Sequence, residues 1–137
     1  MISHITLGTS DKARAEAFYA PIMEVLGLPR RDPAKAKAFV MWTAPDGGRP
    51  FFVLTTPFDG EPAEAGNGNM TALIAPTRAA VDTTHALALA AGAVEEGAPG
   101  LRPQYHENFY GAYFRDLDGN KICIVCHEPD RKEGHTP

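Results

Sequence analysis

The sequence predicts an α+β fold of two βαβββ modules, whose strands form a curled mixed β-sheet cleft with the helices outside. Two hairpin signals support this prediction. Residues 110–127 read YGAYFRDLDGNKICIVCH, in which the Asp-Gly-Asn step supplies residues that tolerate the positive φ angles of a tight turn. Residues 38–55 show a weaker version of the same pattern. The third observation is an internal repeat, because the strand that contains His4 corresponds to one that begins at Met70, 66 positions later (70 − 4).

Length and charge limit the kinds of partner that the chain can have. The 137 residues suffice for one compact unit with a sizeable core. The net charge of −4 argues against binding to nucleic acids or anionic membranes, because both need a basic face. No apolar run approaches a membrane span, and the N-terminal stretch resembles neither a signal peptide nor a transit peptide. We therefore expect a cytoplasmic protein without nucleic-acid or membrane partners, whose two cysteines are thiols.

The first module begins with a strand and a helix. Residues 1–8 alternate between polar and apolar side chains, which predicts a strand with His4 on one face. Ser10 or Asp11 can cap the helix that follows, since both side chains accept hydrogen bonds from free backbone N–H groups. We expect the helix to kink or break at Pro21, which has no N–H to donate.

The rest of the first module is predicted to be mostly β-structure. Gly27 ends the helix, and residues 28–32 are expected to form a short edge strand. The weaker hairpin over residues 38–55 completes the module, which extends over residues 1–57. A linker rich in Gly, Pro and Asn follows at residues 58–68.

The second module, residues 69–127, repeats this order. Residues 70–75 form a strand, and a helix rich in alanine follows from Pro76 to Ala91 with His85 on a solvated or dimer-facing side. A short strand is expected at residues 93–96, before the irregular loop 97–108 and the strong hairpin. Residues 128–137 are expected to be a polar tail. The two modules together are expected to form a single domain over residues 1–137.

Three segments carry a resemblance to a known family. They are HITLGTSDKARAEAFYAPIMEVLGL, NMTALIAPTRAAVDTTHALALAAGA and YGAYFRDLDGNKI. The chain resembles the vicinal-oxygen-chelate superfamily of glyoxalase I, bleomycin-resistance proteins, extradiol dioxygenases and fosfomycin-resistance transferases. The resemblance covers residues 2–127, with Leu117 where the family hairpin has proline. It implies the fold described above, but because these proteins differ in activity it does not decide the function.

The resemblance also implies a position for a metal. Enzymes of this family usually hold one divalent ion with His and Glu side chains from four central strands. In this chain the matching positions are His4, Phe52 or Val53, Met70 and Cys123. Of these, His4 alone is a usual ligand for such an ion, so we expect no metal cofactor. A copper(I) site from His4 with the soft donors Met70 and Cys123 is the alternative.

The string Cys123-Ile124-Val125-Cys126-His127 matches the attachment pattern of haem c. Attachment requires both thiols to reach one porphyrin, whereas residues three apart in a strand point to opposite faces. We therefore predict no haem. Cys123 is expected to face the cleft, and Cys126 is expected to be a small apolar residue on the helix side.

Strand alternation predicts which other side chains line the cleft. Tyr113 and Arg115 share one face of their strand, and Cys123 lies on the same face of the last strand. In the fosfomycin-resistance relatives, the position that matches Tyr113 places a phenol in the active site. We expect His4 and Tyr113, 109 positions apart (113 − 4), to project into one pocket and to be the catalytic residues of an enzyme. The expected ligand-binding residues are Trp42, Phe52, Met70, Tyr105, His106, Tyr113, Arg115 and Cys123.

Two functions of different class remain open. The first is a metal-free cleft that binds a small organic molecule, as the bleomycin-resistance proteins do by sequestration. The second is an enzyme similar to a lactoylglutathione lyase, a dioxygenase or a transferase, with unorthodox metal ligands or acid–base chemistry by His4 with Tyr113 or His106. The missing carboxylate ligands favour binding. The resemblance also implies a homodimer, since relatives commonly pair modules across a two-fold axis.

Overall fold

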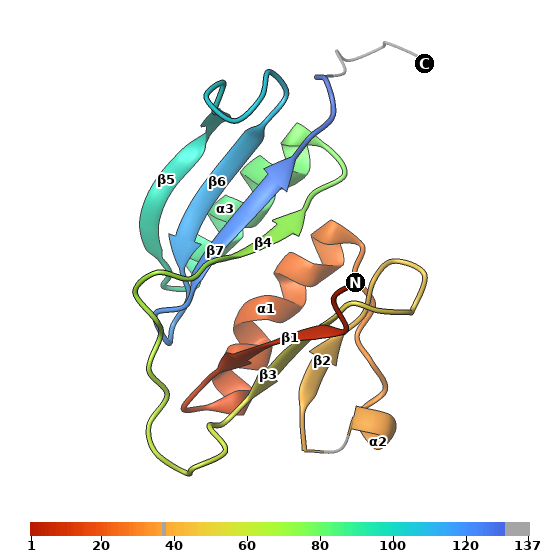
Figure 1. The fold of residues 1–137 in the computed structure, drawn as a ribbon, viewed down its shortest axis with the longest axis vertical. Coiled ribbons are helices and arrows are strands. Elements are labelled where there is room, and N and C mark those ends of the chain that lie inside the picture. Colours follow the sequence, from red (N-terminus) through yellow and green to blue (C-terminus); the bar gives the residue numbers. More distant parts are fainter. Residues whose placement is uncertain (37, 131–137) are drawn as a thin grey trace.

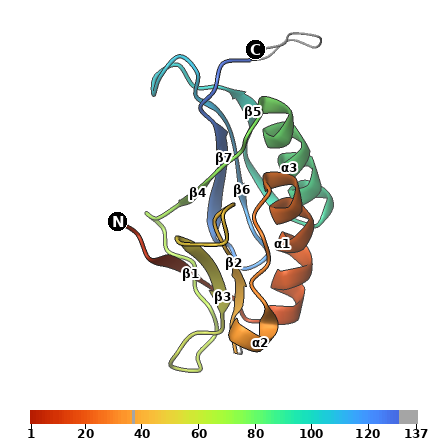
Figure 2. The same ribbon diagram turned by 90° about the vertical axis from the view of Figure 1, so that its right-hand side faces the viewer.

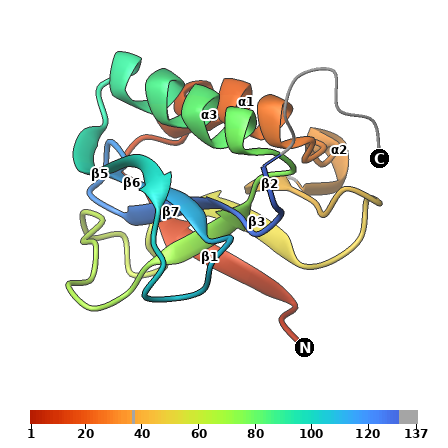
Figure 3. The same ribbon diagram turned by 90° about the horizontal axis from the view of Figure 1, so that it is seen from above.

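A computed structural model gives the fold and describes residues 1–36 and 38–130. Two sheets lie next to each other, and the two long helices cover one side of them (Figure 1, Figure 2). The view from above shows both helices on that same side (Figure 3). We call the two sides of the sheets the helix side and the helix-free side. In the described part of the chain, no helix is both long and apolar enough to cross a bilayer.

The first sheet has three strands. In spatial order they are β1 (His4–Gly8), β3 (Phe51–Thr55) and β2 (Val40–Trp42), with β1 parallel to β3 and β3 antiparallel to β2. Helix α1 (Lys12–Leu26) follows β1, and the short helix α2 (Pro33–Ala36) precedes β2. Asp11 caps the start of α1 by accepting a backbone N–H, and Gly27 ends it in the left-handed conformation.

The second sheet has four strands. In spatial order they are β4 (Thr71–Ile74), β7 (Lys121–Cys126), β6 (Tyr110–Arg115) and β5 (Val94–Leu101). Helix α3 (Arg78–Ala90) follows β4, and the Thr77 side chain caps its start. In both modules the first strand pairs in parallel with the last one, as β1 does with β3 and β4 with β7. The structure confirms the predicted α+β fold of two sheets with helices outside them.

Two local predictions about the first module are wrong. Residues 28–32 form no strand, and a single bridge joins Arg30 to Trp42. Pro29 has no N–H for a ladder, so the first sheet has three strands and not four. Helix α1 also runs through Pro21 without the predicted break, whereas a kink at this residue stays a prediction. Pro21 and Ala17 are exposed, so the carbonyl of Ala17, which loses its helical partner, can be hydrated.

In the second module the strand after α3 is longer than expected. It was expected over residues 93–96, whereas β5 continues to Leu101 and takes part of the expected loop 97–108. Its pairing with β6 shifts register next to Gly97 and again before Gly100. Such bulges break the alternation by which a strand is recognised in a sequence. Of the expected polar tail, residues 131–137 lie outside the described residues.

The core lies between the helices and the helix side of both sheets. Tyr19 of α1 packs its ring 5.1 Å from that of Phe52 and 6.4 Å from that of Trp42, measured between ring centroids. Phe18 reaches the second sheet, with its ring centroid 6.0 Å from that of Phe114. One helix of the first module therefore contacts both sheets, and the two modules share one core.

The β6–β7 turn fastens the second module to the first. Buried Asp116 accepts hydrogen bonds from the Tyr19 hydroxyl at 2.5 Å and from the backbone N–H groups of Asp118 and Asn120, each at 2.9 Å. The Asn120 amide donates to the Gly8 carbonyl at 3.0 Å. The Asp-Gly-Asn turn thus has a structural role, because it supplies the hydrogen-bond partners that buried polar groups require.

Candidate functional site

His4 and Tyr113 lie on the helix-free sides of different sheets. Their strand neighbours Ile5 and Phe114 point to the helix side, because Ile5 pairs with the core residue Phe52 and Phe114 is itself in the core. His4 and Tyr113 consequently point away from the helices. Their surroundings are different, as described below, and the single pocket that we expected for the two side chains remains a prediction.

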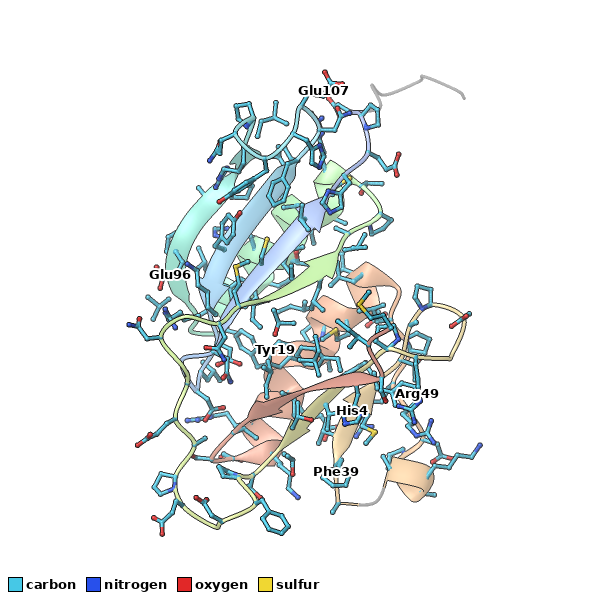
Figure 4. The ribbon with its side chains drawn as sticks, in the orientation of Figure 1. His4, Tyr19, Phe39, Arg49, Glu96 and Glu107 are labelled. Carbon is cyan, nitrogen blue, oxygen red and sulfur yellow. The ribbon has the colours of Figure 1, made fainter. Side chains whose placement is uncertain are left out.

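His4 lines a cavity of about 390 Å³ on the helix-free side of the first sheet. Figure 4 shows it beside Arg49, with Phe39 in the same module. The Nδ1 atom of His4 lies 2.9 Å from the Ser3 hydroxyl, which accepts a hydrogen bond from Arg49 Nη1 at 2.9 Å. The hydroxyl hydrogen is then free to point at Nδ1, so this contact leaves the Nε2 atom of the ring available to a ligand. The remaining lining residues are Arg31, Lys35, Ala36, Met41, Phe51 and Val53.

Tyr113 lies on a face that its own module partly covers. It pairs with Cys123 across β6 and β7, and its ring centroid is 5.4 Å from the Arg102 guanidinium and 5.9 Å from the Lys121 ammonium. A Cβ atom on Gly97 would come within 2.9 Å of the Tyr113 ring, so the glycine lets the ring approach β5 closely. The cover explains why Cys123 is fully buried although it lies on the helix-free side.

The pKa values of Tyr113 and Cys123 do not suit acid–base chemistry near neutral pH. Burial, together with the neighbouring Cys123, raises the pKa of the Tyr113 phenol to about 12. Burial also raises the pKa of the Cys123 thiol, against the lowering effects of Tyr113, Arg102 and Lys121. A general acid or base works best when its pKa lies near the working pH, and a thiol must lose its proton to act as a nucleophile. Tyr113 can therefore donate a hydrogen bond to a ligand, but it is a weak proton donor.

Tyr105 and His106 belong to a surface cluster of aromatic rings beyond the ends of β6 and β7. His106 Nε2 lies 2.8 Å from His127 Nδ1, and the two imidazoles are stacked with centroids 5.1 Å apart. The Tyr105 ring packs 4.8 Å from Phe109, again between centroids. Both residues are exposed, so the expected role of the pair in ligand binding stays a prediction.

Three other residues of interest lie elsewhere. Met70 precedes β4 and is 47% exposed. The Arg115 guanidinium is engaged within the module, since it donates to Glu96 at 2.6 Å and to the Gly119 carbonyl at 2.8 Å. His85 was expected on a solvated or dimer-facing side of its helix, which is wrong: it is buried and lies 2.8 Å from Glu95 of β5.

Trp42 and Phe52 are two of the expected ligand-binding residues, and that role stays a prediction. Both side chains point to the helix side, where they are 2% and 5% exposed and contact Tyr19. Their neighbours Met41 and Phe51 occupy the helix-free side instead. An error of one position in reading a strand places every residue on the wrong side of the sheet. All four of these residues are apolar, so the sequence does not show which of them face the helices.

A second hollow, of about 400 Å³, runs along the seam between the two sheets. Figure 1 shows β1 and β4 next to each other there, as the neighbouring edges of their sheets. One wall comes from β1, β3, the β2–β3 connection and the end of α1, and the other comes from β4. We call this the seam groove, and its lining is almost wholly apolar. Its lining residues are Ile5, Leu26, Leu28, Thr43, Ala44, Pro45, Pro50, Phe51, Phe52, Thr71, Ala72, Leu73, Ile74 and Pro76.

The residues at the expected metal positions do not fit a divalent ion. Beside His4 they provide a buried valine, an exposed thioether and a fully buried thiol of raised pKa. Divalent ions of this kind need several imidazole, carboxylate or thiolate donors around one point. Within residues 1–36 and 38–130, no three His, Cys, Asp or Glu side chains lie close enough together to hold a metal ion.

Comparison with known proteins connects this architecture to a family. The family model described as Glyoxalase/Bleomycin resistance protein/Dioxygenase superfamily matches residues 1–124. The chain belongs to this superfamily. A solved member, a glyoxalase/bleomycin resistance protein from Albidiferax ferrireducens T118, is 33% identical and has a TM-score of 0.78, with 94% of this chain and 99% of that chain covered.

More distant members of the superfamily show the same fold. A glyoxalase/bleomycin resistance protein/dioxygenase family enzyme from Burkholderia phytofirmans PsJN is 21% identical, with a TM-score of 0.68 and coverage of 92% of this chain and 98% of that one. A lactoylglutathione lyase from Agrobacterium tumefaciens is 24% identical, with a TM-score of 0.58 and 92% of each chain covered. The search of curated proteins gave no significant match.

Proposed function

We propose that the protein binds a small, largely apolar organic molecule in the seam groove and does so without a metal. The observation that carries the proposal is the groove itself, whose volume of about 400 Å³ falls within the range of small-molecule pockets. Both modules contribute to it, through Ile5 and Phe52 on one side and Leu73 on the other. A groove of this size takes a compound of one or two rings, which excludes water from both walls.

The metal-free part of the proposal rests on the donor set described above. Val53 and Met70 cannot supply the anionic or imidazole ligands of a divalent ion, and Cys123 keeps its proton. Binding by apolar contact needs no such ion. We therefore expect a chelator to leave ligand binding unchanged.

A direct titration tests the proposal. Trp42 is the only tryptophan, and its ring centroid lies 6.3 Å from that of Phe52 in the groove wall, so its fluorescence should report occupancy. The neutral probe N-phenyl-1-naphthylamine should bind and change this signal, with or without EDTA. The substitution Ala72→Phe places a ring in the groove and should weaken probe binding at least tenfold. Its matched control is Ala86→Phe on the exposed side of α3.

The outcomes are distinguishable. Equal probe binding by wild type and Ala72→Phe would refute the groove as the site. One tightly held divalent ion per chain in metal analysis, lost together with probe binding on chelation, would refute the metal-free part. Loss of the groove by self-association would show as a concentration-dependent affinity for the probe, and the groove would then be a contact between two copies.

A second candidate is acid–base catalysis by His4. The observation in its favour is the hydrogen-bonded series Arg49–Ser3–His4, which orients the imidazole in a cavity. It requires His4→Ala to abolish conversion of a compound that the protein still binds. Mass spectrometry of that compound after incubation with wild type and variant tests this candidate.

A further inference from the structure

The cavity around His4, which we call the cationic cavity, concentrates positive charge in a chain of net charge −4. Arg31, Lys35 and Arg49 line it together with His4, and none of its lining residues is acidic among those that the structure describes. Figure 4 shows His4 and Arg49 in the first module, far from the labelled Glu96 and Glu107 of the second. Like charges this close repel each other, so the cavity favours an anion.

The acidic residues nearest in sequence are turned to other partners. The Asp32 carboxylate accepts the backbone N–H of Ala34 at 2.9 Å, and the Asp46 carboxylate accepts that of Gly48 at 2.8 Å. Within the described residues, the ion pairs are Arg14–Asp118, Arg30–Glu16, His85–Glu95 and Arg115–Glu96. None of them involves a cation of the cavity.

The cavity also offers apolar surface beside the charges. The guanidinium carbons of Arg31 and Arg49 lie 4.9 Å and 4.4 Å from the ring centroid of Phe51, which is half-buried. Cation–π contacts of this kind hold both guanidinium groups against the ring and reduce their freedom before a ligand arrives. Met41 and Val53 complete the apolar floor.

His4 adds a directed hydrogen-bond donor. Its Nδ1 atom is paired with Ser3, which Arg49 in turn orients. When the Ser3 hydroxyl donates to Nδ1, the ring carries its hydrogen on Nε2, which has no hydrogen-bond partner in the described part of the chain. An anionic oxygen is the natural acceptor for such a donor between guanidinium groups.

We propose that the cationic cavity binds a small organic carboxylate, with the carboxylate near His4, Arg31 and Arg49 and a flat apolar body against Phe51. The apolar floor is the reason for an organic acid in place of inorganic phosphate, which offers nothing to that surface. This site is separate from the seam groove, because all of their lining residues differ except Phe51. The two proposals can therefore fail independently.

Isothermal titration of the full chain with 2-naphthoate tests the proposal, with 2-naphthamide as the neutral probe of the same shape and inorganic phosphate as the anion without a ring. Naphthoate should bind, the amide should bind at least tenfold more weakly, and phosphate should be weaker than naphthoate. Arg31→Gln and Lys35→Gln should each weaken naphthoate binding about two- to fivefold, as expected for partly exposed charge pairs. Added salt should weaken it further.

Two controls isolate the effect. Arg14→Gln removes the same charge from the exposed surface of α1 and should leave the affinity unchanged. Ala72→Phe, which fills the seam groove, should also leave naphthoate binding unchanged. NMR shifts of the Met41 and Val53 methyl groups should follow the titration, which places the probe in the cavity even if a variant folds poorly. Equal binding of naphthoate and naphthamide, or full affinity in the Arg31→Gln/Lys35→Gln double variant, would overturn the proposal, as would phosphate binding as tightly as naphthoate.

Discussion

The two modules share a strand order, but they differ in what covers their helix-free sides and in how their hairpin turns are held. In the second module, Arg102 lies over Tyr113, and the Phe109 ring fits against Gly111, where a Cβ atom would come within 2.9 Å of it. In the first module, His4 and Phe51 face an open cavity. The repeated topology therefore provides one closed face and one open face, which places the candidate binding surfaces on and beside the first module.

The two hairpin turns differ in the same way. The β6–β7 turn places Asp116 in the interior with a hydrogen bond from Tyr19 of the other module. The β2–β3 turn places Asp46 at the surface, where its carboxylate accepts a single backbone N–H from Gly48. One turn is part of the core and the other forms a rim of the seam groove, through Thr43, Ala44 and Pro45.

Removal of the turn carboxylates should produce the largest difference between the modules. Asp116→Ala leaves the buried Tyr19 hydroxyl and two turn N–H groups without their acceptor, so we expect the free energy of unfolding to fall by about 3 kcal/mol or more. Asp46→Ala removes one exposed hydrogen bond and should cost less than about 1 kcal/mol. Urea unfolding followed by circular dichroism measures both. Equal losses for the two variants would contradict the assignment of the second turn to the core.

Self-association should depend on the part of the helix-free side that neither module covers. We expect a homodimer of twice the 14.7 kDa chain mass, because Met70, which precedes the edge strand of the second sheet and does not line the seam groove, is 47% exposed. Met70→Asp should weaken the dimer about tenfold, which corresponds to roughly 1.4 kcal/mol. Analytical ultracentrifugation measures the change, with the exposed linker substitution Phe58→Asp as control. A monomer at tens of micromolar wild-type chain would show the expectation to be wrong.

The smallest effect concerns the closed face at alkaline pH. The native pKa of Tyr113 is about 12, above the ordinary value of 10.0, so between these values the native state keeps a proton that the unfolded state has lost. The free energy of unfolding should therefore be unaffected below about pH 10 and should fall as the pH rises from about 10 to 12. Tyr113→Phe should make this fall shallower in urea unfolding. Tyr110→Phe should make the fall shallower in the same way, since the pKa of Tyr110 is also raised to about 12. An unchanged slope in Tyr113→Phe would mean that this phenol is not shielded.

Family membership and the order of most elements could be predicted from the sequence because they depend on local, repeated features. The cap at Asp11 and the turn at Gly119 act through backbone geometry within a few residues, and the structure has both. Alternation in residues 110–126 was also readable, because the polar residues Arg115 and Lys121 pair on one side of the sheet and the apolar residues Phe114 and Ile122 pair on the other. It placed Tyr113 and Cys123 on one face of the sheet and Phe114 and Ile122 on the other face, toward the helices. The pairing register confirms this placement.

The tertiary structure alone decided the candidate sites. Four apolar residues in Met41-Trp42 and Phe51-Phe52 give no phase, so contact with Tyr19, which is distant in sequence, determines which of them face the helices. The cationic cavity brings together three separate segments of the chain, which hold His4, the pair Arg31 and Lys35, and Arg49. No local sequence motif joins these segments. The seam groove exists because β1 and β4 end as neighbouring sheet edges without pairing to each other. Local sequence sets the backbone within each module, whereas long-range packing sets which side chains meet between segments, and ligands bind where those side chains meet.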